Sequence, residues 1–574
     1  VTFTGGPAVG GLTILGEFQL TYSAGTSYTI TFTSAATSTT TGGGTVYAVY
    51  QVNPGSSIVS PLSGWGSGPW GSGTWGNGSA SAEALRIWNQ FNFGEDLLYG
   101  PRGGPLYYWD ATIGYQAATI TLTIATPCVV STTINLLDLT PIVLETSGAL
   151  PTGLLVGTIY YTRFVSATTF NLSLTPAGAL IDTSGTQSGV HKISQRGVLL
   201  SVLPFASAVP LSQTYFLVSD ASRFVICFGT NDIGSSVVDP MLVRWSDQED
   251  PTMWTPAITN QSGSITLSHG SAIVTAIQSK QEIVIFTDSA LYSLQYLGAP
   301  YVWGSQLLGD NTSLVGPNAV TLAAGTIYWM GVDKFYKYDG RLQTLGCDLL
   351  RYVYNDIDRV QFAQVYASTN EGFNEVWWFY PSNGSTTNDS YIVYNYLENI
   401  WYYGTMARTA WLDSGLQDYP IAATYSNNLV SHELGVDDGV TATLAPITAF
   451  ITSSQFDIGD GHNFAFVWRM LPDLTFNGST DGATPSLTMQ LLPLQNSGSG
   501  FNNPKSVGGD SSSAEGTVTA TQTYPIDLDT YNGQLNIRVR ARQMAMKISS
   551  NTLGTQWQMG APRIDIRPDG RRGG

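Results

Sequence analysis

The feature that most constrains the fold is a pair of aromatic, β-branched runs that recurs along the middle of the chain. The clearest pair lies at residues 374–403, where Asn-Glu-Val-Trp-Trp-Phe-Tyr and Tyr-Ile-Val-Tyr-Asn-Tyr flank a loop of Ser, Asn, Thr and Gly. Two such runs around a turn-rich loop predict a β-hairpin. We therefore interpret the middle of the chain as built from repeats of this hairpin.

Six copies of the hairpin can be recognised. They lie at 96–110, 224–245, 282–294, 326–338 with an Asp339-Gly340 turn, 374–403, and more weakly at 421–432. From the second copy onward the spacing is roughly 44 to 60 residues, which is typical of propeller blades. The first gap is much longer and holds a separate β-rich segment. The pattern predicts an all-β fold with a β-propeller of about six blades, interrupted by an inserted β domain, and with small β modules at both ends.

These observations give four predicted segments. Residues 1–80 form an N-terminal β module with a Trp/Gly-rich linker, and residues 81–444 form the propeller. Residues 111–194 are the inserted β domain, and residues 445–574 form a β-sandwich or extended sheet with a basic tail. The one helix expected covers 348–355, with 356–364 continuing it.

Composition excludes several classes of protein. Charged residues make up only 11% of the 574 residues, and the formal net charge is −17. An acidic chain argues against a general nucleic-acid clamp and against adhesion to anionic membranes. Three widely spaced cysteines make no disulfide framework and fit synthesis in a reducing compartment. No apolar run reaches a membrane span, and the start at Val1 suggests the remainder of a longer or processed product.

No catalytic, cofactor or metal motif is found, so we assign no residue to any of these roles. The four histidines lack metal-ligand spacing, and no phosphate-binding loop or nucleophile elbow occurs. Carboxylates gather at 246–251, 356–358, 437–439 and 457–461. They admit a glycosidase pair, a calcium site, or turn and cap chemistry, and Asp-Gly and Asp-Pro pairs favour the last.

Two segments are candidates for contact with other subunits. Trp65, Trp70 and Trp75 are spaced by five in a Gly/Ser-rich stretch. They indicate a loop pinned on a neighbouring domain, a contact with a partner subunit, or a carbohydrate platform. The tail carries basic residues in an otherwise acidic chain, and is either a solvated terminus or a docking arm for an acidic neighbour. Its candidate residues are Arg563, Arg567, Arg571 and Arg572.

Several long motifs together resemble a known family. They are Arg-Trp-Ser-Asp-Gln-Glu-Asp-Pro-Thr-Met-Trp-Thr-Pro at 244–256, Leu-Tyr-Ser-Leu-Gln-Tyr-Leu-Gly-Ala-Pro-Tyr-Val-Trp at 291–303, Tyr-Trp-Met-Gly-Val-Asp-Lys-Phe-Tyr at 328–336, Glu-Val-Trp-Trp-Phe-Tyr-Pro at 375–381 and Tyr-Asn-Tyr-Leu-Glu-Asn-Ile-Trp-Tyr-Tyr-Gly at 394–404. Over about 85–439 the chain resembles the tail nozzle proteins of short-tailed bacteriophages, also called tail tubular protein B or phage DNA-stabilisation protein.

The resemblance implies a structural virion protein of the tail, assembled in the bacterial host cytoplasm. Six copies would form a ring below the portal and the head–tail adaptor protein. Tail fibres and a tail tip or needle protein would dock on that ring, and genomic DNA would pass through its lumen without specific binding. The charge fits independently, because six chains of −17 give about −102, and an acidic lumen repels phosphates within about 10 Å.

Two rival hypotheses come from other classes. One is a carbohydrate-binding or glycan-degrading propeller like a tailspike, in which Asp247 or Asp250 would be needed for sugar turnover. The other is a monomeric scaffold with a calcium site, whose melting temperature would respond to a chelator.

Overall fold

The computed structural model divides the chain into two compact units, Val1–Leu416 and Gln417–Gly574. The structure describes the chain apart from residues 1, 5–8, 13–15, 18–19, 25–26, 31–34, 43–46, 50–54, 60–84, 112–117, 135, 137, 167, 176–177, 195–196, 221, 416, 442, 460–461, 495–521, 528–530 and 572–574.

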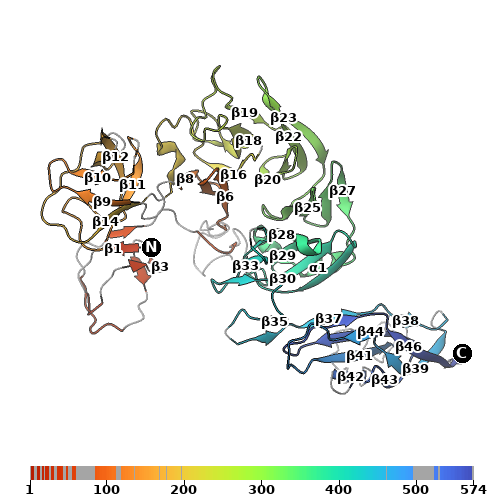
Figure 1. Cartoon of the computed structure of the whole chain (residues 1–574). Helices are drawn as coiled ribbons and strands as arrows, with labels where there is room; N and C mark the ends of the chain where they lie inside the picture. The colour runs from red at the N-terminus through yellow and green to blue at the C-terminus, as the bar shows by residue number, and fades with distance from the viewer. Residues whose placement is uncertain are drawn as a thin grey trace, which may run out of the picture. The chain divides into compact units, whose positions relative to one another are not determined.

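Five four-stranded antiparallel sheets make up most of the first unit, and Figure 1 shows them arranged around a common centre. The first holds β6 (Trp88–Phe93), β7 (Asp96–Pro101), β8 (Tyr107–Trp109) and β15 (Val198–Leu199). The second holds β16 (Gln213–Val218), β17 (Val225–Asn231), β18 (Val238–Trp245) and β19 (Gly263–Thr266). The third holds β20 (Ile273–Gln278), β21 (Ile283–Thr287), β22 (Ala290–Gly298) and β23 (Val302–Asp310).

The fourth sheet holds β24 (Val320–Ala323), β25 (Thr326–Met330), β26 (Phe335–Tyr338) and β27 (Leu342–Leu345). The fifth holds β28 (Tyr366–Asn370), β29 (Glu375–Tyr380), β30 (Ser390–Asn395) and β31 (Ile400–Thr405). The next sheet along the chain has three strands in the order β32 (Ala410–Leu412), β33 (Ile421–Ala423), β34 (Leu429–Ser431), and the division between the two units falls between β32 and β33. The fold is therefore a β-propeller of six sheets, as the sequence predicts.

The aromatic hairpins of the sequence are the second and third strands of the four-stranded sheets. Strands β17, β21 and β29 are buried along their whole length. A strand in the middle of a sheet that is itself covered on both faces needs apolar residues at every position. This explains why these runs are continuously hydrophobic and aromatic, and do not alternate with polar residues.

Hydrophobic clusters lie between consecutive sheets. One joins the second and third sheets through residues such as Phe228 and Tyr292, and another joins the third and fourth through Phe286 and Trp329. The fourth and fifth sheets share a cluster that includes Trp378. The blades thus bury their faces against one another, and no separate core at the centre is needed.

The inserted domain is a closed six-stranded barrel placed between the third and fourth strands of the first sheet. Its strands are β9 (Ala118–Leu122), β10 (Val129–Thr132), β11 (Pro141–Thr146), β12 (Ile159–Ser166), β13 (Thr169–Ser173) and β14 (His191–Ser194). They close in the order β10-β13-β12-β11-β14-β9 around a core that includes Ile142, Phe170 and Ile193.

Small β modules lie at both ends of the chain. The first is made of β1 (Thr2–Thr4), β2 (Gly16–Glu17), β3 (Leu20–Ala24), β4 (Ser27–Ile30) and β5 (Tyr47–Val49). The second unit is a sandwich of two sheets with a shared core around Val467, Met489 and Ile548. One sheet has β37 (Ala449–Thr452), β44 (Gln543–Ser550), β41 (Ser486–Leu494) and β42 (Gln522–Asp527), with β38 (Phe456–Asp457) on β44.

The other sheet of the sandwich has the order β43 (Leu535–Ala541), β39 (Asn463–Leu471), β46 (Arg563–Arg571). The second unit also holds two two-stranded pairs, β35 (Asp437–Asp438) with β36 (Ala445–Pro446), and β40 (Leu474–Thr475) with β45 (Gln558–Met559). Helical segments in the described chain are α1 (Leu350–Asp356) and the 3₁₀ turns η1 (Leu200–Val202), η2 (Arg359–Gln364) and η3 (Glu371–Phe373). The helix expected over 348–364 is thus divided between α1 and η2.

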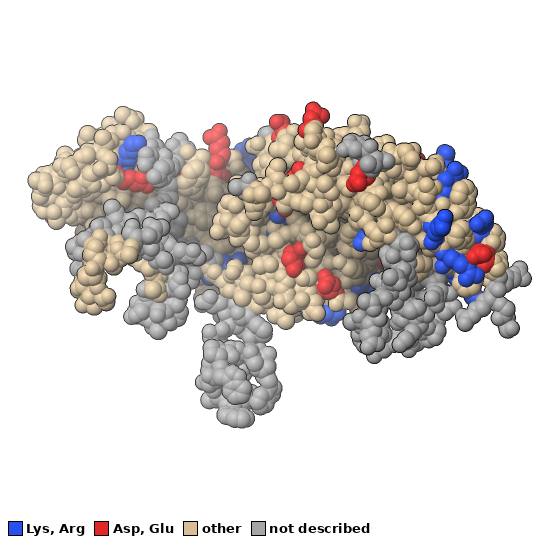
Figure 2. All heavy atoms as spheres, turned by 90° about the horizontal axis from the view of Figure 1, so that it is seen from below, with Lys and Arg blue, Asp and Glu red and all other residues tan. Residues whose placement is uncertain are grey.

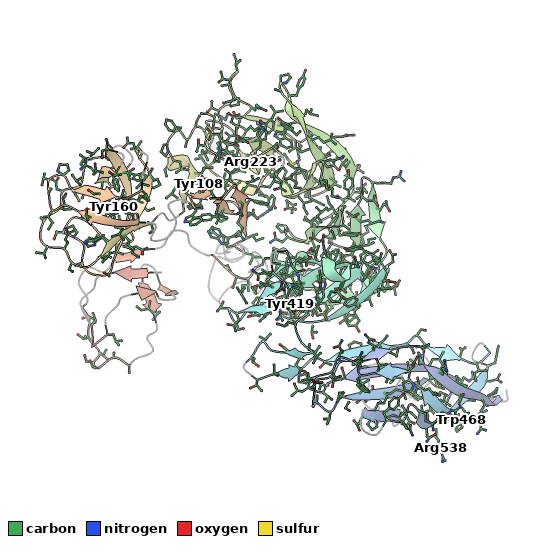
Figure 3. The ribbon with its side chains drawn as sticks, viewed as in Figure 1. Tyr108, Tyr160, Arg223, Tyr419, Trp468 and Arg538 are labelled. Atoms are coloured by element: carbon green, nitrogen blue, oxygen red, sulfur yellow. The ribbon has the colours of Figure 1, made fainter. Side chains whose placement is uncertain are left out.

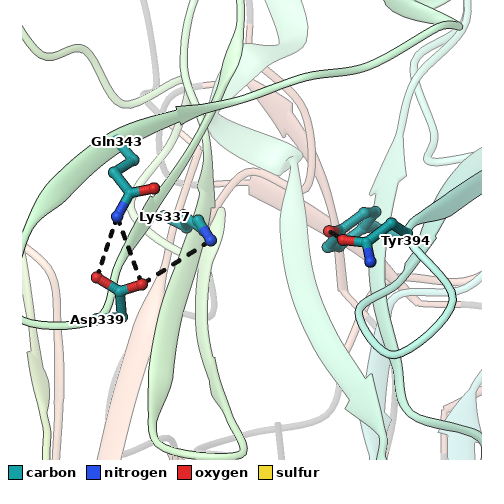
Figure 4. Close-up of polar contacts among 5 residues, drawn as sticks. Lys337, Asp339, Gln343 and Tyr394 are labelled. Atoms are coloured by element: carbon teal, nitrogen blue, oxygen red, sulfur yellow. Dashed lines mark hydrogen bonds and ion pairs between the residues drawn. The ribbon is translucent and has the colours of Figure 1, made fainter.

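Turns between the strands use the residues that the sequence indicates (Figure 4). The turn from β26 to β27 is made by Asp339 and Gly340, and Gly340 has φ of 98°. The Asp339 carboxylate accepts hydrogen bonds from Gln343 Nε2 at 3.3 and 3.5 Å and lies 3.8 Å from Lys337 Nζ. In the fifth sheet, Tyr394 Oη donates to Asn399 Oδ1 at 2.8 Å.

Replacing Gly340 with alanine is expected to cost about 1–2 kcal/mol of folding free energy, because a residue with a Cβ atom is strained at positive φ. A Cβ atom there would meet nothing within 4 Å, so the cost comes from the backbone alone. Gly346→Ala is the matched control, since its Cβ atom is also unobstructed and no positive φ occurs. Denaturant unfolding of both variants tests this, and equal midpoints would contradict it.

Candidate functional site: the central cavity of the propeller

The first strand of each sheet lies nearest the propeller axis. Strand β16 contacts both β6 and β20, and β24 contacts both β20 and β28. Each of these strands has a hydrogen-bonded neighbour on one side only within its own sheet. Their residues are therefore the ones that surround the centre of the propeller.

A cavity of about 280 Å³ opens between these inner strands. Its polar and aromatic lining comes from five consecutive sheets: Tyr215, Thr275, Asn318, Tyr366, Thr409 and Trp411. None of the described residues that line it is charged. The volume is at the lower end of ordinary small-ligand pockets, which hold about 300–1,000 Å³, and is far too small to admit duplex DNA.

The chemistry of the cavity suits a neutral polar molecule with one apolar face. Trp411 and the two tyrosines offer ring faces, while the threonines and Asn318 offer hydrogen-bonding groups. Burial raises the pKa of Tyr215 to about 12, an effect that its hydrogen bond with Thr275 partly offsets. The Tyr215 phenol therefore stays protonated near neutral pH and remains a hydrogen-bond donor.

Arg102 ties three blades together beside this cavity. It lies just after β7, and its Nη1 atom donates to the carbonyl oxygens of Thr214 at 3.2 Å and Val274 at 2.6 Å. Those carbonyls belong to β16 and β20, next to the cavity residues Tyr215 and Thr275. Burial lowers the pKa of Arg102 to about 10, so the guanidinium stays charged at neutral pH. These two hydrogen bonds connect the end of β7 in the first sheet to the inner strands of the second and third sheets.

The acidic residues considered for catalysis are engaged in turns. Asp247 Oδ1 accepts from the backbone nitrogens of Gln248 at 2.9 Å and Gln261 at 2.8 Å. Asp250 Oδ1 accepts from Thr252 N at 2.8 Å and Thr252 Oγ1 at 2.6 Å. Neither carboxylate lines the central cavity. Turn chemistry accounts for their positions.

One residue from each of the other three acidic groups also accepts hydrogen bonds. Asp358 caps η2 by accepting from Val360 N at 2.8 Å, and Asp437 accepts from Gly554 N at 2.9 and 3.0 Å. Asp457 accepts from Gln543 Nε2 at 3.0 Å. Within the described parts of the chain, no group of three or more His, Cys, Asp or Glu side chains is placed to hold a metal ion. Among the same residues, no helix combines the length and hydropathy needed to cross a bilayer.

Of the predicted subunit-contact residues, the structure places two with their side chains. Arg563 and Arg567 are exposed on β46, which is a paired strand of the sandwich rather than a free arm. Arg571 is the last residue of that strand. Trp65, Trp70, Trp75 and Arg572 lie outside the described residues.

The sequence analysis predicted neither the cavity nor the aromatic side chains on the strand next to Arg563 and Arg567. The inner strands that line the cavity are short and mixed in polarity, so they carry no strong signal. On β39, Phe466 lies opposite Arg567 and contacts its guanidinium, and Phe464 and Trp468 belong to the same strand. Apolar residues at both odd and even positions of 464–468 are the signal that could have revealed a second, outward-facing apolar row.

The three cysteines are expected to react poorly in the folded protein. Cys128 and Cys227 are buried, and burial raises the pKa of both thiols. Burial also raises the pKa of the half-buried Cys347 to about 11. At pH 8 its thiolate is therefore roughly a hundredfold scarcer than that of an ordinary cysteine, and the thiolate is the reactive form.

Titration with a thiol reagent tests this expectation. We expect slow labelling of Cys347 at pH 8, faster labelling as the pH approaches 11, and rapid labelling of all three thiols after unfolding. Because the folded pKa is raised, the protonated thiol contributes stability that is lost as the pH rises above the unfolded value near 9. Rapid labelling of the native protein at pH 8 would contradict the burial.

Comparison with known proteins gives no family. No protein-family model matches the chain, and no curated protein matches it. Among solved structures, a match to the endosialidase of phage phi92 has 11% identity and a TM-score of 0.23, and covers 63% of this chain and 67% of that one. An exo-β-1,3-galactanase from Phanerochaete chrysosporium has 9% identity and a TM-score of 0.19, with 83% and 95% of the two chains covered.

A third match is the extracellular domain of a protein described as a one-component system of B. thetaiotaomicron. It has 9% identity and a TM-score of 0.26, and covers 52% of this chain. This chain spans about a third of the length of that protein, with 34% covered. At these TM-scores the likenesses carry no information about activity.

Proposed function

We propose that this chain is a structural subunit of the tail nozzle of a short-tailed bacteriophage. In this role several copies form a ring that continues the DNA channel below the portal and adaptor, retains the genome and passes it at infection. The observation that carries the proposal is where the family-like motifs lie. The motifs at 375–381 and 394–404 contribute Trp378, Tyr394 and Trp401 to the packing between the fourth and fifth sheets. Because these motif residues are core residues, the resemblance supports a shared fold. A shared fold is what a structural ring subunit requires.

Exposed apolar side chains also support a subunit that assembles. Ile258, Phe205, Leu429, Tyr301 and Val237 are each at least three-quarters exposed. Single exposed apolar residues are common on monomers, but large exposed apolar side chains also mark surfaces that a partner can cover. Contact between copies, or with adaptor and fibre proteins, would cover them.

The proposed role is not catalytic. A glycosidase would use two carboxylates facing its substrate, and the described residues that line the cavity include none. Asp247 and Asp250 accept hydrogen bonds from the backbone of their own turn. Asp247→Asn and Asp250→Asn variants would therefore affect the stability of that turn rather than any sugar turnover.

Counting the chains in purified virions tests the proposal. Quantitative mass spectrometry against the portal protein is expected to give six copies per particle, and electron microscopy of the isolated chain is expected to show closed rings. Absence of the chain from virions, or a copy number near eighteen, would overturn the nozzle and indicate a fibre, a tailspike or a protein outside the virion.

A second candidate is a glycan-binding propeller, favoured by one observation. The central cavity combines the rings of Tyr215, Tyr366 and Trp411 with threonine and asparagine side chains. Calorimetric titration with host polysaccharide fragments tests it, and Asn318→Ala should then weaken binding. Absence of binding at millimolar glycan would exclude this candidate.

A further inference from the structure

The outer face of one sheet in the second unit carries an unusual row of aromatic side chains. In the sheet β43-β39-β46, residues such as Val467 on β39 and Val539 on β43 point into the sandwich core. Phe464, Phe466 and Trp468 on β39 lie on the opposite side, and Trp468 is 44% exposed. A sheet with apolar residues on both faces usually has a partner on each.

Arginines from all three strands surround these rings. The Cζ atom of Arg540 lies 4.2 Å from the centre of the Phe464 ring, and that of Arg567 lies 5.0 Å from the Phe466 ring. The register confirms the arrangement, because Phe466 is directly opposite Arg540 on β43 and Arg567 on β46. We call this surface the arginine–aromatic face, and its members are Phe464, Phe466, Trp468, Arg469, Arg538, Arg540, Arg542, Arg563 and Arg567.

The face has a net positive charge. Two acidic residues lie among its arginines, and each is paired: Asp565 with Arg469 at 2.5 Å and Asp569 with Arg540 at 2.6 Å. The other four arginines of the face form no ion pair with a described residue. Figure 2 shows basic side chains gathered on the second unit with few acidic ones among them, and Figure 3 shows Trp468 and Arg538 projecting from the same side.

The composition of the face fits a protein partner better than a nucleic acid. All its basic residues are arginines, and arginine with tryptophan and phenylalanine is enriched in protein interfaces, where lysine is depleted. Asp565 and Asp569 within the face would repel a phosphate backbone, whereas a protein surface of mixed charge can accommodate them. The partner expected is therefore acidic and proteinaceous.

The first unit of the chain is strongly acidic as a whole. The first unit holds 14 of the 24 basic residues and 27 of the 41 acidic ones, so its formal charge is 14 − 27 = −13. The second unit holds the remaining 10 basic and 14 acidic residues, for a charge of −4. A locally basic face on the second unit and a net charge of −13 on the first favour a head-to-tail contact between copies, which closes into a ring when the rotation allows it.

We propose that the arginine–aromatic face docks onto the acidic first unit of a second copy of this chain. This inference rests on the proposed function only in requiring that copies associate. Trp468 and its neighbours would supply the buried anchors, and the unpaired arginines would supply orientation and salt sensitivity.

Self-association of the full chain tests the inference, measured by sedimentation velocity at 0.05, 0.15 and 0.5 M NaCl. Trp468→Ala and Arg538→Glu are each expected to raise the dissociation constant at least about tenfold, and added salt should weaken wild-type association. Arg538 is exposed and has no ion pair with a described residue, so its replacement should not disturb the fold. Lys547→Glu is the matched control, because it makes the same charge change on the other sheet of the sandwich, beside Phe450.

Each outcome decides a different question. If wild type and all variants associate equally, the inference falls and the nozzle proposal stands. If the two face variants dissociate but wild type forms open chains and is absent from virions, the inference stands and the nozzle proposal falls. Wild type that stays monomeric at all concentrations overturns both. Binding of a labelled thirty-nucleotide oligothymidylate that is lost in the face variants, with self-association unchanged, would overturn the inference in favour of single-stranded nucleic acid.

Discussion

Replacing Trp378 with alanine is expected to lower the free energy of unfolding by about 3–5 kcal/mol, the usual cost of removing a large aromatic side chain from a core. Trp378 is fully buried in β29, with ring centres of Phe335 and Trp401 at 5.0 and 5.9 Å. Its Nε1 atom donates to Ala319 O at 3.2 Å, and the variant loses this hydrogen bond, although that carbonyl still accepts from Met330 N at 3.1 Å. Because these partners belong to the fourth and fifth sheets, the loss should loosen the packing between two blades.

Denaturant unfolding followed by near-ultraviolet circular dichroism measures this loss. Trp468→Ala is the matched control, since the same side chain is removed from an exposed position where about 1 kcal/mol or less is expected. A loss below about 1 kcal/mol for Trp378→Ala would mean that the two sheets do not share the core described here.

The second large effect is expected at Arg244, where alanine should cost about 3–5 kcal/mol. The guanidinium is buried in the second sheet and donates to Asn231 O at 2.9 Å and Ala208 O at 2.7 Å. Its Cζ atom also lies 5.9 Å from the centre of the Trp254 ring. Hydrogen bonds from a charged donor contribute about 1.5–3 kcal/mol each, and both carbonyls would lose their donor. Burial lowers the pKa of Arg244, but an arginine remains charged at neutral pH.

Arg244→Lys should recover part of this loss, because one ammonium group cannot reach both carbonyls with the geometry of a guanidinium. Arg223→Ala is the matched control, since Arg223 is exposed in the turn between β16 and β17 of that sheet and should change stability by about 0.5 kcal/mol or less. Equal unfolding midpoints for Arg244→Ala and Arg223→Ala would show that the hydrogen bonds from Arg244 to Asn231 O and Ala208 O do not stabilise the fold.

The strands of the propeller that could be predicted from the sequence are those buried on both faces, where polar residues are not tolerated. Strands β17, β21 and β29 are covered on both faces, so their aromatic and β-branched runs were visible as hairpins. The position of the inserted domain was also predictable, since it interrupts the spacing of those hairpins. The first and fourth strands are the edge strands of each sheet, with a hydrogen-bonded neighbour on one side only. Most of them mix polar and apolar residues, so no clear strand pattern marked them in the sequence.

The candidate sites depend on juxtapositions that a linear pattern does not contain. The cavity brings Tyr215, Thr275 and Trp411 together from three different sheets. The arginine–aromatic face needs the register of β39 against both β43 and β46, which are distant in sequence. The tail residues predicted to contact other subunits whose side chains are described, Arg563 and Arg567, lie on this face.

The placement of the barrel has a consequence for the order of folding. Its first and last strands, β9 and β14, pair with each other, with Ala118 opposite Ile193. Until the barrel forms, β15 must find β8 across a loop of 88 residues, from 110 to 197, and closing a long flexible loop is entropically costly. Once the barrel has formed, the ends of that loop are already held together, and only short connections remain to close. We therefore expect the barrel to fold before the first blade is completed, with the rate of barrel formation limiting how soon β15 joins its sheet.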